Sequence, residues 1–193
     1  MTPLHEVIIN KKTTINPVWI MRQAGRYLPE FREIRKKNPN FIELCLNHNL
    51  SSEITLQPVK RFDLDAAIIF SDILMLPYGL NQKVDFKKDF GPVLGNLDMG
   101  TMSKIDEIDF IEKIYPIYKA IKSVSSKMTS MNKNTIGFVG APWTLLVYMI
   151  NQQSPKKNIK KDFFEDDFLI NRILLLIEKF LKIHIKNQIE NGA

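Results

Sequence analysis

The chain has 193 residues, of which 45% are hydrophobic and 25% charged, with a net charge of +6 and one cysteine. This composition excludes a disordered chain, and the single Cys45 excludes an internal disulfide and any multi-cysteine zinc or iron–sulfur site. No stretch reaches the roughly 18 uninterrupted apolar residues of a membrane span, and the N-terminus lacks a secretory signal pattern. We therefore expect a cytoplasmic globular protein with one domain over residues 1–193.

The segment before the first strand predicts three helices. An apolar extended run over 17–21 leads to a glycine turn and to a helix that Pro29 starts. A second short helix is predicted over 40–47. Ser51 or Ser52 is the predicted N-cap of a third helix, which runs to about Arg61.

Two continuous apolar runs are typical of buried parallel strands. The first covers 66–70 and the second covers 136–139. Between them, residues 83–90 alternate in a way that predicts a small hairpin. An amphipathic helix is predicted from 105 to about 126, with a kink at Pro116.

The second predicted strand leads through a turn into a helix that bears Tyr148. A loop over 151–161 then precedes a long helix from about 163 to 190, which Asn191 and Gly192 end. This order of strands and helices predicts an α/β fold with a parallel sheet and helices packed outside it. Two parallel strands cannot bury both faces of a sheet, so we expect part of a larger architecture, incomplete at the C-terminus.

The arginines are concentrated in one short stretch. The chain has 21 Lys but only 6 Arg, and Arg22, Arg26, Arg32 and Arg35 lie within fourteen residues. A guanidinium group binds carboxylates or phosphates through two parallel hydrogen bonds, so the cluster predicts an anion site. The alternative is a solvated helix face, which suits Arg32 better than Arg22 and Arg26, because these two have uncharged neighbours.

Two further side chains follow the predicted strands. Asp72 comes directly after the first strand, and Tyr148 lies in the helix after the second. Ligands of α/β folds bind beyond the carboxyl ends of the strands, so both side chains are placed to face a mouth lined by the arginine segment. The structural alternatives are an ion pair for Asp72 and core packing for Tyr148.

Three segments of the chain resemble the uroporphyrinogen decarboxylase family, namely PVWIMRQAGRYLPEFREIR, ITLQPVKRFDLDAAIIFSDIL and GFVGAPWTLLVYM. The resemblance implies a partial (β/α)₈ TIM barrel, with the first strands and helices present and the C-terminal part missing. It also implies a homodimeric carboxy-lyase that uses no metal or cofactor. Such an enzyme decarboxylates the four acetate side chains of uroporphyrinogen III and gives coproporphyrinogen III for haem biosynthesis.

The resemblance also assigns roles to residues. The positions that match substrate-binding residues are Arg22, Gln23, Ala24, Gly25, Arg26, Arg35, Asp72 and Tyr148, and those that match catalytic residues are Asp72, Arg22, Arg26 and Tyr148. Asp72 is expected to accept hydrogen bonds from pyrrole N–H groups and to stabilise a ring cation. The family also uses a Ser or Thr and a His from the second half of its barrel, and His5, His48 and His184 do not stand in the matching context.

Three other interpretations stay open at this point. The chain can be an inactive fragment or pseudoenzyme that keeps the motifs, and its uncovered strand edge would make it unstable alone. A related barrel methyltransferase would hold zinc with His and Cys, and the arginine and Phe-Ser-Asp motifs argue against it. A nucleic-acid binder would need a basic stripe with stacking aromatic residues, so the expected ligand is the anionic tetrapyrrole, with neither nucleic acid nor membrane as partner.

Overall fold

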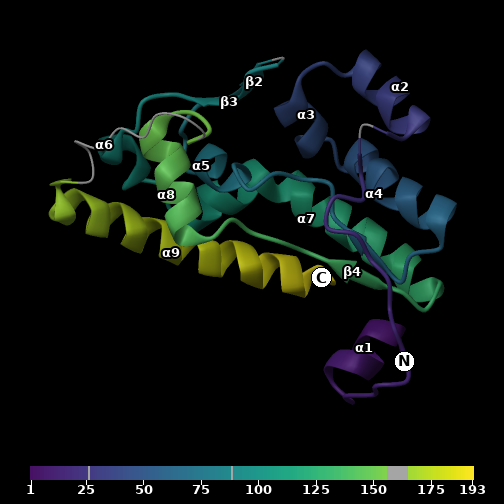
Figure 1. Ribbon diagram of the computed structural model, residues 1–193. Helices are drawn as coiled ribbons and strands as arrows, with labels where there is room; N and C mark the ends of the chain where they lie inside the picture. Colours follow the sequence, from purple (N-terminus) through teal and green to yellow (C-terminus); the bar gives the residue numbers. More distant parts are fainter. Residues whose placement is uncertain (26, 88, 156–164) are drawn as a thin grey trace.

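The computed structural model describes residues 1–25, 27–87, 89–155 and 165–193 of the chain (Figure 1). Its elements in chain order are α1 (Pro3–Ile8), α2 (Pro29–Lys37), α3 (Phe41–Leu46), α4 (His48–Phe62), β1 (Ala66–Ile68), α5 (Met75–Gly79), β2 (Val84–Lys87), β3 (Gly91–Leu94), α6 (Met99–Met102), α7 (Glu107–Ser130), β4 (Asn134–Ile136), α8 (Pro142–Asn151) and α9 (Asp167–Glu190). Three predicted features lie outside the described residues: Arg26, the second half of the 151–161 loop, and the start of the long helix near residue 163.

The predicted parallel pairing of the two apolar runs is confirmed. β1 pairs with β4, with Ala66 opposite Asn134 and Ile68 opposite Ile136. The Ile69 N–H extends this pairing by donating to the Ile136 carbonyl at 3.0 Å. The two strands are joined by a crossover that contains α7, as parallel strands require. The α/β class predicted from the sequence is therefore confirmed.

The second strand lies earlier in the chain than the predicted range 136–139. β4 covers 134–136, and the chain leaves the strand at Gly137. The Gln188 side chain of α9 accepts from the Phe138 N–H and donates to the Phe138 carbonyl, at 3.0 Å in each case. The Gln188 amide thus takes the place of a strand partner at Phe138. The apolar run therefore continues to Val139, although the strand ends at Ile136.

The predicted N-cap of α4 is wrong. The cap is Asn47, whose Oδ1 accepts from the Leu50 N–H at 3.1 Å. Ser51 and Ser52 lie inside the helix, and the Ser51 hydroxyl donates to the Phe70 carbonyl beyond β1 instead. Asn is as good an N-cap as Ser, so local sequence does not distinguish Asn47 from Ser51 as the cap. Ser51 is used instead for the tertiary hydrogen bond to the Phe70 carbonyl.

The other predicted helices are confirmed with small shifts at their ends. α2 starts at Pro29, α3 has Asn40 as its N-cap, and α7 starts after Asp106 and continues across Pro116. The predicted hairpin is present as the antiparallel pair of β2 and β3, but the range 83–90 is too short, because β3 covers Gly91–Leu94. Helices α1, α5 and α6 have no counterpart in the prediction, since they are too short to show a helical repeat.

Helix α7 lies at the centre of the hydrophobic core. It contacts α3, α4, α5, α9, β1 and β4, and Figure 1 shows it crossing the molecule between α4 and α9. Its buried side chains are Phe110, Ile114, Ile117, Tyr118, Ala120, Ile121, Val124 and Met128. These side chains belong to one core cluster that extends from α2 to α9, whereas Leu4 of α1 is buried outside it.

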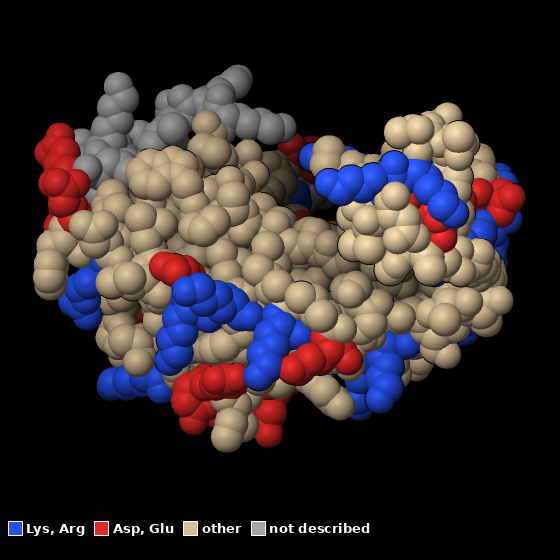
Figure 2. Space-filling model, turned by 90° about the horizontal axis from the view of Figure 1, so that it is seen from below, with Lys and Arg blue, Asp and Glu red and all other residues tan. Residues whose placement is uncertain are grey.

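Acidic and basic side chains are intermixed on one outer face of the molecule. Figure 2 shows Lys and Arg beside Asp and Glu along one margin of the face seen from below, with uncharged side chains across its middle. On α9, Lys182 pairs with Glu178 at 2.6 Å. The described residues of this face therefore form no continuous basic stripe of the kind that nucleic-acid binding needs. Among the described helices, none is long and apolar enough to cross a membrane.

A buried polar pair joins α7 to α9. The Tyr118 hydroxyl lies 2.9 Å from Nδ1 of His184, and Phe110 and Phe180 pack around the pair. Burial lowers the pKa of His184 from 6.5 to about 4. The imidazole is therefore neutral in the folded protein at neutral pH, which is the form that accepts or donates one hydrogen bond without a buried charge.

We expect the stability of the chain to depend on His184 in mildly acidic solution. Unfolding between pH 6.5 and about 4 takes up a proton at this imidazole, so its contribution lowers the free energy of unfolding as the pH falls through that window. The full effect is at most about 3 kcal/mol. Denaturant unfolding at several pH values measures it.

The comparison is between two variants. Tyr118→Phe keeps the imidazole and should keep the pH dependence, whereas Tyr118→Phe with His184→Leu removes the titrating group and should flatten it. Other groups titrate in the same window, so the difference between the two variants is the quantity to follow. Equal slopes for both variants would contradict the role of His184.

Candidate active site

Asp72 lies just beyond the carboxyl end of β1. The chain leaves the strand at Ile68, and Asp72 begins the turn into α5, where its Oδ1 accepts from the Leu74 N–H at 2.8 Å. Its side chain is partly buried. Burial raises the pKa of Asp72 from 3.8 to about 6, against the opposing effect of the Leu74 hydrogen bond. At pH 7 the site therefore holds a carboxylate that is mostly ionised but costly to keep charged.

This pKa argues against a structural ion pair for Asp72. A neighbouring cation would lower the pKa of the carboxyl group, but the shift is upward, and among the described residues no cation contributes to it. Among the residues that the structure describes, no salt bridge includes Asp72. Its negative charge is thus available to a ligand.

The backbone before Asp72 is held by two hydroxyl groups of α4. The Phe70 N–H donates to Thr55 Oγ1 at 2.8 Å, and the Phe70 carbonyl accepts from Ser51 Oγ at 2.7 Å. Thr55 in turn donates to the Ser51 carbonyl at 2.7 Å. All three groups are buried, so these bonds end β1 at a defined place and fix where Asp72 begins the next turn.

Arg35 is brought to the same side of the molecule as Asp72. Its guanidinium donates to the Asn38 carbonyl at 2.6 Å and lies 5.6 Å from the centre of the Phe41 ring. Phe41 in turn packs edge-on against Phe70, at 5.7 Å between ring centres. Asp72 raises and Arg35 lowers the pKa of the buried Cys45 thiol, although burial itself is the largest cause of its upward shift. One aspartate and one arginine therefore approach the same buried group.

Helix α2, which carries Arg35, is attached to α4 by a two-point ion pair. Arg61 donates from Nε and Nη2 to the two carboxylate oxygens of Glu30, at 3.0 and 2.9 Å. Such paired hydrogen bonds fix orientation as well as distance. The bond therefore helps to hold α2 against the helix that also secures Phe70.

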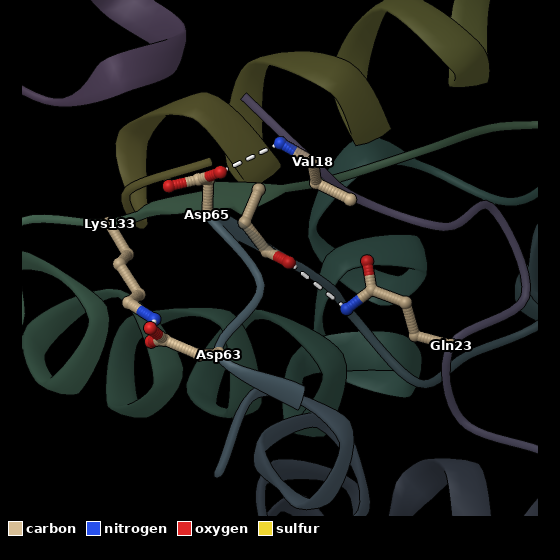
Figure 3. Close-up of polar contacts among 6 residues, drawn as sticks. Val18, Gln23, Asp63, Asp65 and Lys133 are labelled. Carbon is tan, nitrogen blue, oxygen red and sulfur yellow. Dashed lines mark hydrogen bonds and ion pairs between the residues drawn. The ribbon is translucent and has the colours of Figure 1, made fainter. Parts of the chain in front are cut away.

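The part of the chain before α2 that carries Arg22, residues 17–25 and here called the arginine segment, is attached at the opposite end of β1. Gln23 is buried, and its Nε2 donates to the Ala66 carbonyl at 3.0 Å (Figure 3). Its Oε1 accepts from the Ile20 N–H at 3.2 Å. Arg22 beside it is exposed. Both ends of the Gln23 amide are thus bonded within the chain, which favours a positioning role over direct contact with substrate.

Two small residues complete the described part of this segment. Ala24 is partly buried against the core. Gly25 lies so close to the Tyr27 ring that an added Cβ atom would overlap with it. The Tyr27 hydroxyl donates to the Gln23 carbonyl at 2.6 Å, so glycine is required here by close approach rather than by an unusual φ angle.

The predicted site residues thus fall into two groups. Asp72 and Arg35 lie beyond the carboxyl end of β1, whereas Arg22 and Gln23 lie near its amino end. Over the described ranges, no hydrogen bond or ion pair joins the arginine segment to Asp72. Arg26 lies outside the described residues. The sequence predicts one site lined by all of these residues. In the described structure they form two groups that are anchored separately, one at each end of β1.

Tyr148 lies in α8, which follows β4 after a short turn. Its side chain is partly buried and packs against the core, and its carbonyl accepts from the Gln152 N–H at the end of the helix. These contacts agree with the packing alternative and leave its catalytic role a prediction. In the described part of the chain, no cluster of three or more His, Cys, Asp or Glu side chains could hold a metal ion.

Sequence analysis missed two residues that shape these groups. Asp65 bonds the arginine segment to β1 (Figure 3), and Phe41 lies between Arg35 and the end of β1. An acidic residue directly before a wholly apolar strand was a usable signal for Asp65. Phe41 had none, because an aromatic residue in the first turn of an amphipathic helix is ordinary core composition.

Comparison with known proteins matches the chain to one family. A model described as uroporphyrinogen decarboxylase (URO-D) matches residues 1–193. The chain is 40% identical to a uroporphyrinogen decarboxylase of Campylobacter jejuni subsp. jejuni serotype O:2, over 97% of this chain and 56% of the relative. It is 41% identical to that of Rickettsia felis, over 92% of this chain and 51% of the relative. The chain therefore spans about half the length of the curated relatives that it matches.

A solved structure of a methyltransferase from Methanosarcina mazei is also similar in fold. The TM-score is 0.64 at 16% sequence identity, over 83% of this chain and 48% of the other. This likeness concerns the arrangement of helices and strands alone. It supports the α/β architecture and carries no statement about the reaction.

We expect Asp72→Asn to stabilise the fold at pH 7. The raised pKa means that the folded state keeps a proton on Asp72 that the unfolded state loses between pH 3.8 and about 6. Ionised Asp72 therefore destabilises the fold above pH 6, and the isosteric amide removes a cost of about 1–3 kcal/mol. The gain should shrink as the pH falls from 6 to 4.

Asp98→Asn is the matched control for this measurement. Hydrogen bonds, the largest from the Thr101 hydroxyl, hold the pKa of Asp98 below its usual value, so loss of its charge should give no gain in stability. Both variants are followed by denaturant unfolding at pH 7 and pH 4.5. Unchanged or lower stability of Asp72→Asn at pH 7 would contradict a buried, unpaired carboxylate.

Proposed function

This chain belongs to the uroporphyrinogen decarboxylase family, and we propose that it takes part in decarboxylating the four acetate side chains of uroporphyrinogen III to give coproporphyrinogen III. The observation that carries the proposal is Asp72, a half-buried carboxylate with a pKa of about 6 and no cationic partner in the described residues. An anion kept unpaired at the carboxyl end of a strand is suited to a reaction that develops positive charge. No cofactor is needed for this chemistry.

The proposed reaction passes through a protonated pyrrole ring. A proton adds to the pyrrole α-carbon next to the ring carbon that bears the acetate arm, which makes the ring a cation and an electron sink. The bond to the carboxylate then breaks, carbon dioxide leaves, and the bonding electrons neutralise the ring as an exocyclic methylene group. A second proton converts the methylene to methyl, and loss of the first proton restores the pyrrole, so each acetate consumes one proton net.

Asp72 has two roles in this proposal. Its carboxylate accepts hydrogen bonds from the pyrrole N–H groups, and its charge stabilises the cationic intermediate. Because Asp72 is already oriented by the Leu74 N–H, little reorganisation is needed when the cation forms. A pKa near 6 keeps it ionised at neutral pH.

The arginines are proposed to bind the carboxylates of the substrate. Arg35 and Arg22 supply permanent charge and paired hydrogen bonds, and Arg26 joins them by resemblance to the family motif. Gln23, Ala24 and Gly25 place these side chains. Tyr148 is proposed to orient a ring or a carboxylate.

We also propose that the chain forms the first part of a (β/α)₈ barrel. The order β1, α7, β4 and α9 consists of two consecutive strand and helix units with parallel strands, which supports this architecture. Homodimer formation and a cytoplasmic location are expected by resemblance to the family.

The alternative is a non-catalytic member of the family. The chain spans about half the length of the curated relatives that it matches, so activity is tested within a full-length protein. A hybrid protein distinguishes the catalytic from the non-catalytic proposal. In it, this chain replaces the matched part of the full-length Campylobacter jejuni relative. The 193-residue chain is assayed alone in parallel.

We expect the hybrid to convert uroporphyrinogen III to coproporphyrinogen III, with products separated by chromatography after oxidation to porphyrins. Asp72→Asn in the hybrid should lower turnover at least about 100-fold, whereas Asp98→Asn should leave it unchanged. A folded hybrid without product would favour the non-catalytic alternative. Full turnover by the Asp72→Asn hybrid would contradict the role of Asp72.

Substrate binding gives a second, independent prediction. Arg35→Lys in the 193-residue chain should weaken binding of uroporphyrin III, the stable oxidised octacarboxylate, about tenfold, because an ammonium group loses the two-point hydrogen bond. Fluorescence titration measures the Kd. Arg172→Lys on α9 is the control, because Arg172 is exposed and lies over the Phe168 ring. Equal Kd values for all three proteins would contradict carboxylate binding by Arg35.

A further inference from the structure

The arginine segment has no regular structure of its own to hold it. Between the end of α1 and the start of α2, the described residues contain no helix or strand. Its large apolar side chains do not anchor it by burial either, since Val18, Ile20 and Met21 are 55%, 51% and 73% exposed. The position of Arg22 must therefore be set by polar contacts to the rest of the chain.

Asp65 makes the longest-range of these contacts. Its Oδ2 accepts from the Val18 N–H at 2.7 Å, and its own N–H donates to the Val18 carbonyl at 2.9 Å (Figure 3). Two bonds to the same residue fix both the distance and the direction of the segment at this point. The second anchor, Gln23 on the Ala66 carbonyl, lies one residue further along β1.

Asp65 is itself held by the sheet. Its carbonyl accepts from the Asn134 N–H at 3.1 Å, at the start of the pairing of β1 with β4. Close by, Lys133 forms an ion pair with Asp63 (Figure 3). Asp63 joins the end of α4 to the turn before β4, and among the described residues no hydrogen bond or ion pair links it to the arginine segment. The two neighbouring aspartates thus have different partners: the Asp63 carboxylate binds Lys133, and the Asp65 carboxylate binds the Val18 N–H of the arginine segment.

We propose that Asp65 is a positioning residue that sets the orientation of Arg22 toward the substrate by holding Val18 against β1. Arg22 lies between the two anchors, four residues after Val18 and one before Gln23. Removal of the Asp65 carboxylate leaves Val18 with only the backbone bond from the Asp65 N–H, while Gln23 still holds the other end of the stretch. The inference rests on the proposed function, because it assigns Arg22 to substrate carboxylates.

The test uses three variants of the 193-residue chain and two measurements. Asp65→Ala removes the acceptor, and Asp65→Asn keeps an acceptor oxygen at the same place. Asp63→Ala breaks the ion pair with Lys133 and destabilises the left-handed backbone of position 63, but it leaves both bonds between Asp65 and Val18 intact. Hydrogen exchange of the peptide that contains the Val18 amide reports on the anchor. Titration with uroporphyrin III reports on the carboxylate site.

We expect Asp65→Ala to speed exchange at Val18 about tenfold and to weaken uroporphyrin binding about tenfold. Asp65→Asn should stay within about threefold of wild type in both measurements. Asp63→Ala should leave both unchanged even if it lowers the melting temperature, which separates positioning from general stability.

Each other outcome is decisive. Unchanged exchange in Asp65→Ala overturns the anchor, and faster exchange with unchanged binding overturns its role in orienting Arg22. An equal loss of binding in Asp63→Ala would assign the effect to stability and also overturn the inference. Wild type that does not bind uroporphyrin counts against the proposed function, while the exchange results still decide whether Asp65 holds the segment.

Discussion

Helix α7 is covered by α4, by α9 and by the strands β1 and β4, and the placement of both groups of site residues follows from that burial. The three registered residue pairs of the β1 and β4 ladder offer little area by themselves. The buried side chains of α7, with Tyr118 bonded to His184 across to α9, supply the packing that keeps the strands parallel. Parallel strands place their carboxyl ends at one edge, which is where Asp72 emerges.

The two ends of β1 are secured in different ways. At the carboxyl end, buried hydroxyl groups of Ser51 and Thr55 bond the Phe70 backbone, so the position of Asp72 depends on packing within the core. At the amino end, Asp65 and Gln23 bond a segment whose apolar side chains are exposed. Core packing thus fixes one group of candidate site residues, and a few polar contacts fix the other.

Local pattern in the sequence was sufficient for the elements that depend on composition. The apolar runs predicted both parallel strands, and Pro29 and Asn40 marked helix starts correctly. Local sequence pattern did not predict the places where a side chain distant in sequence bonds the backbone. Gln188 bonds Phe138 from 50 residues away, and Asp65 bonds Val18 from 47 residues away. Such contacts leave no periodic signal, and their residue types are equally common on solvated surfaces.

The charges near the end of β1 are close but not neutralised by each other. Arg35 donates to a carbonyl at the end of its own helix and lies over Phe41, while Asp72 accepts only a backbone N–H among the described groups. An ion pair between them would have lowered the pKa of Asp72, but burial raises it instead. Since a mutual ion pair would satisfy both charges, their separate anchoring supports the proposed roles, in which Arg35 binds a substrate carboxylate and Asp72 accepts from a pyrrole N–H. The proposed substrate, with anionic arms on a ring that becomes cationic, needs both.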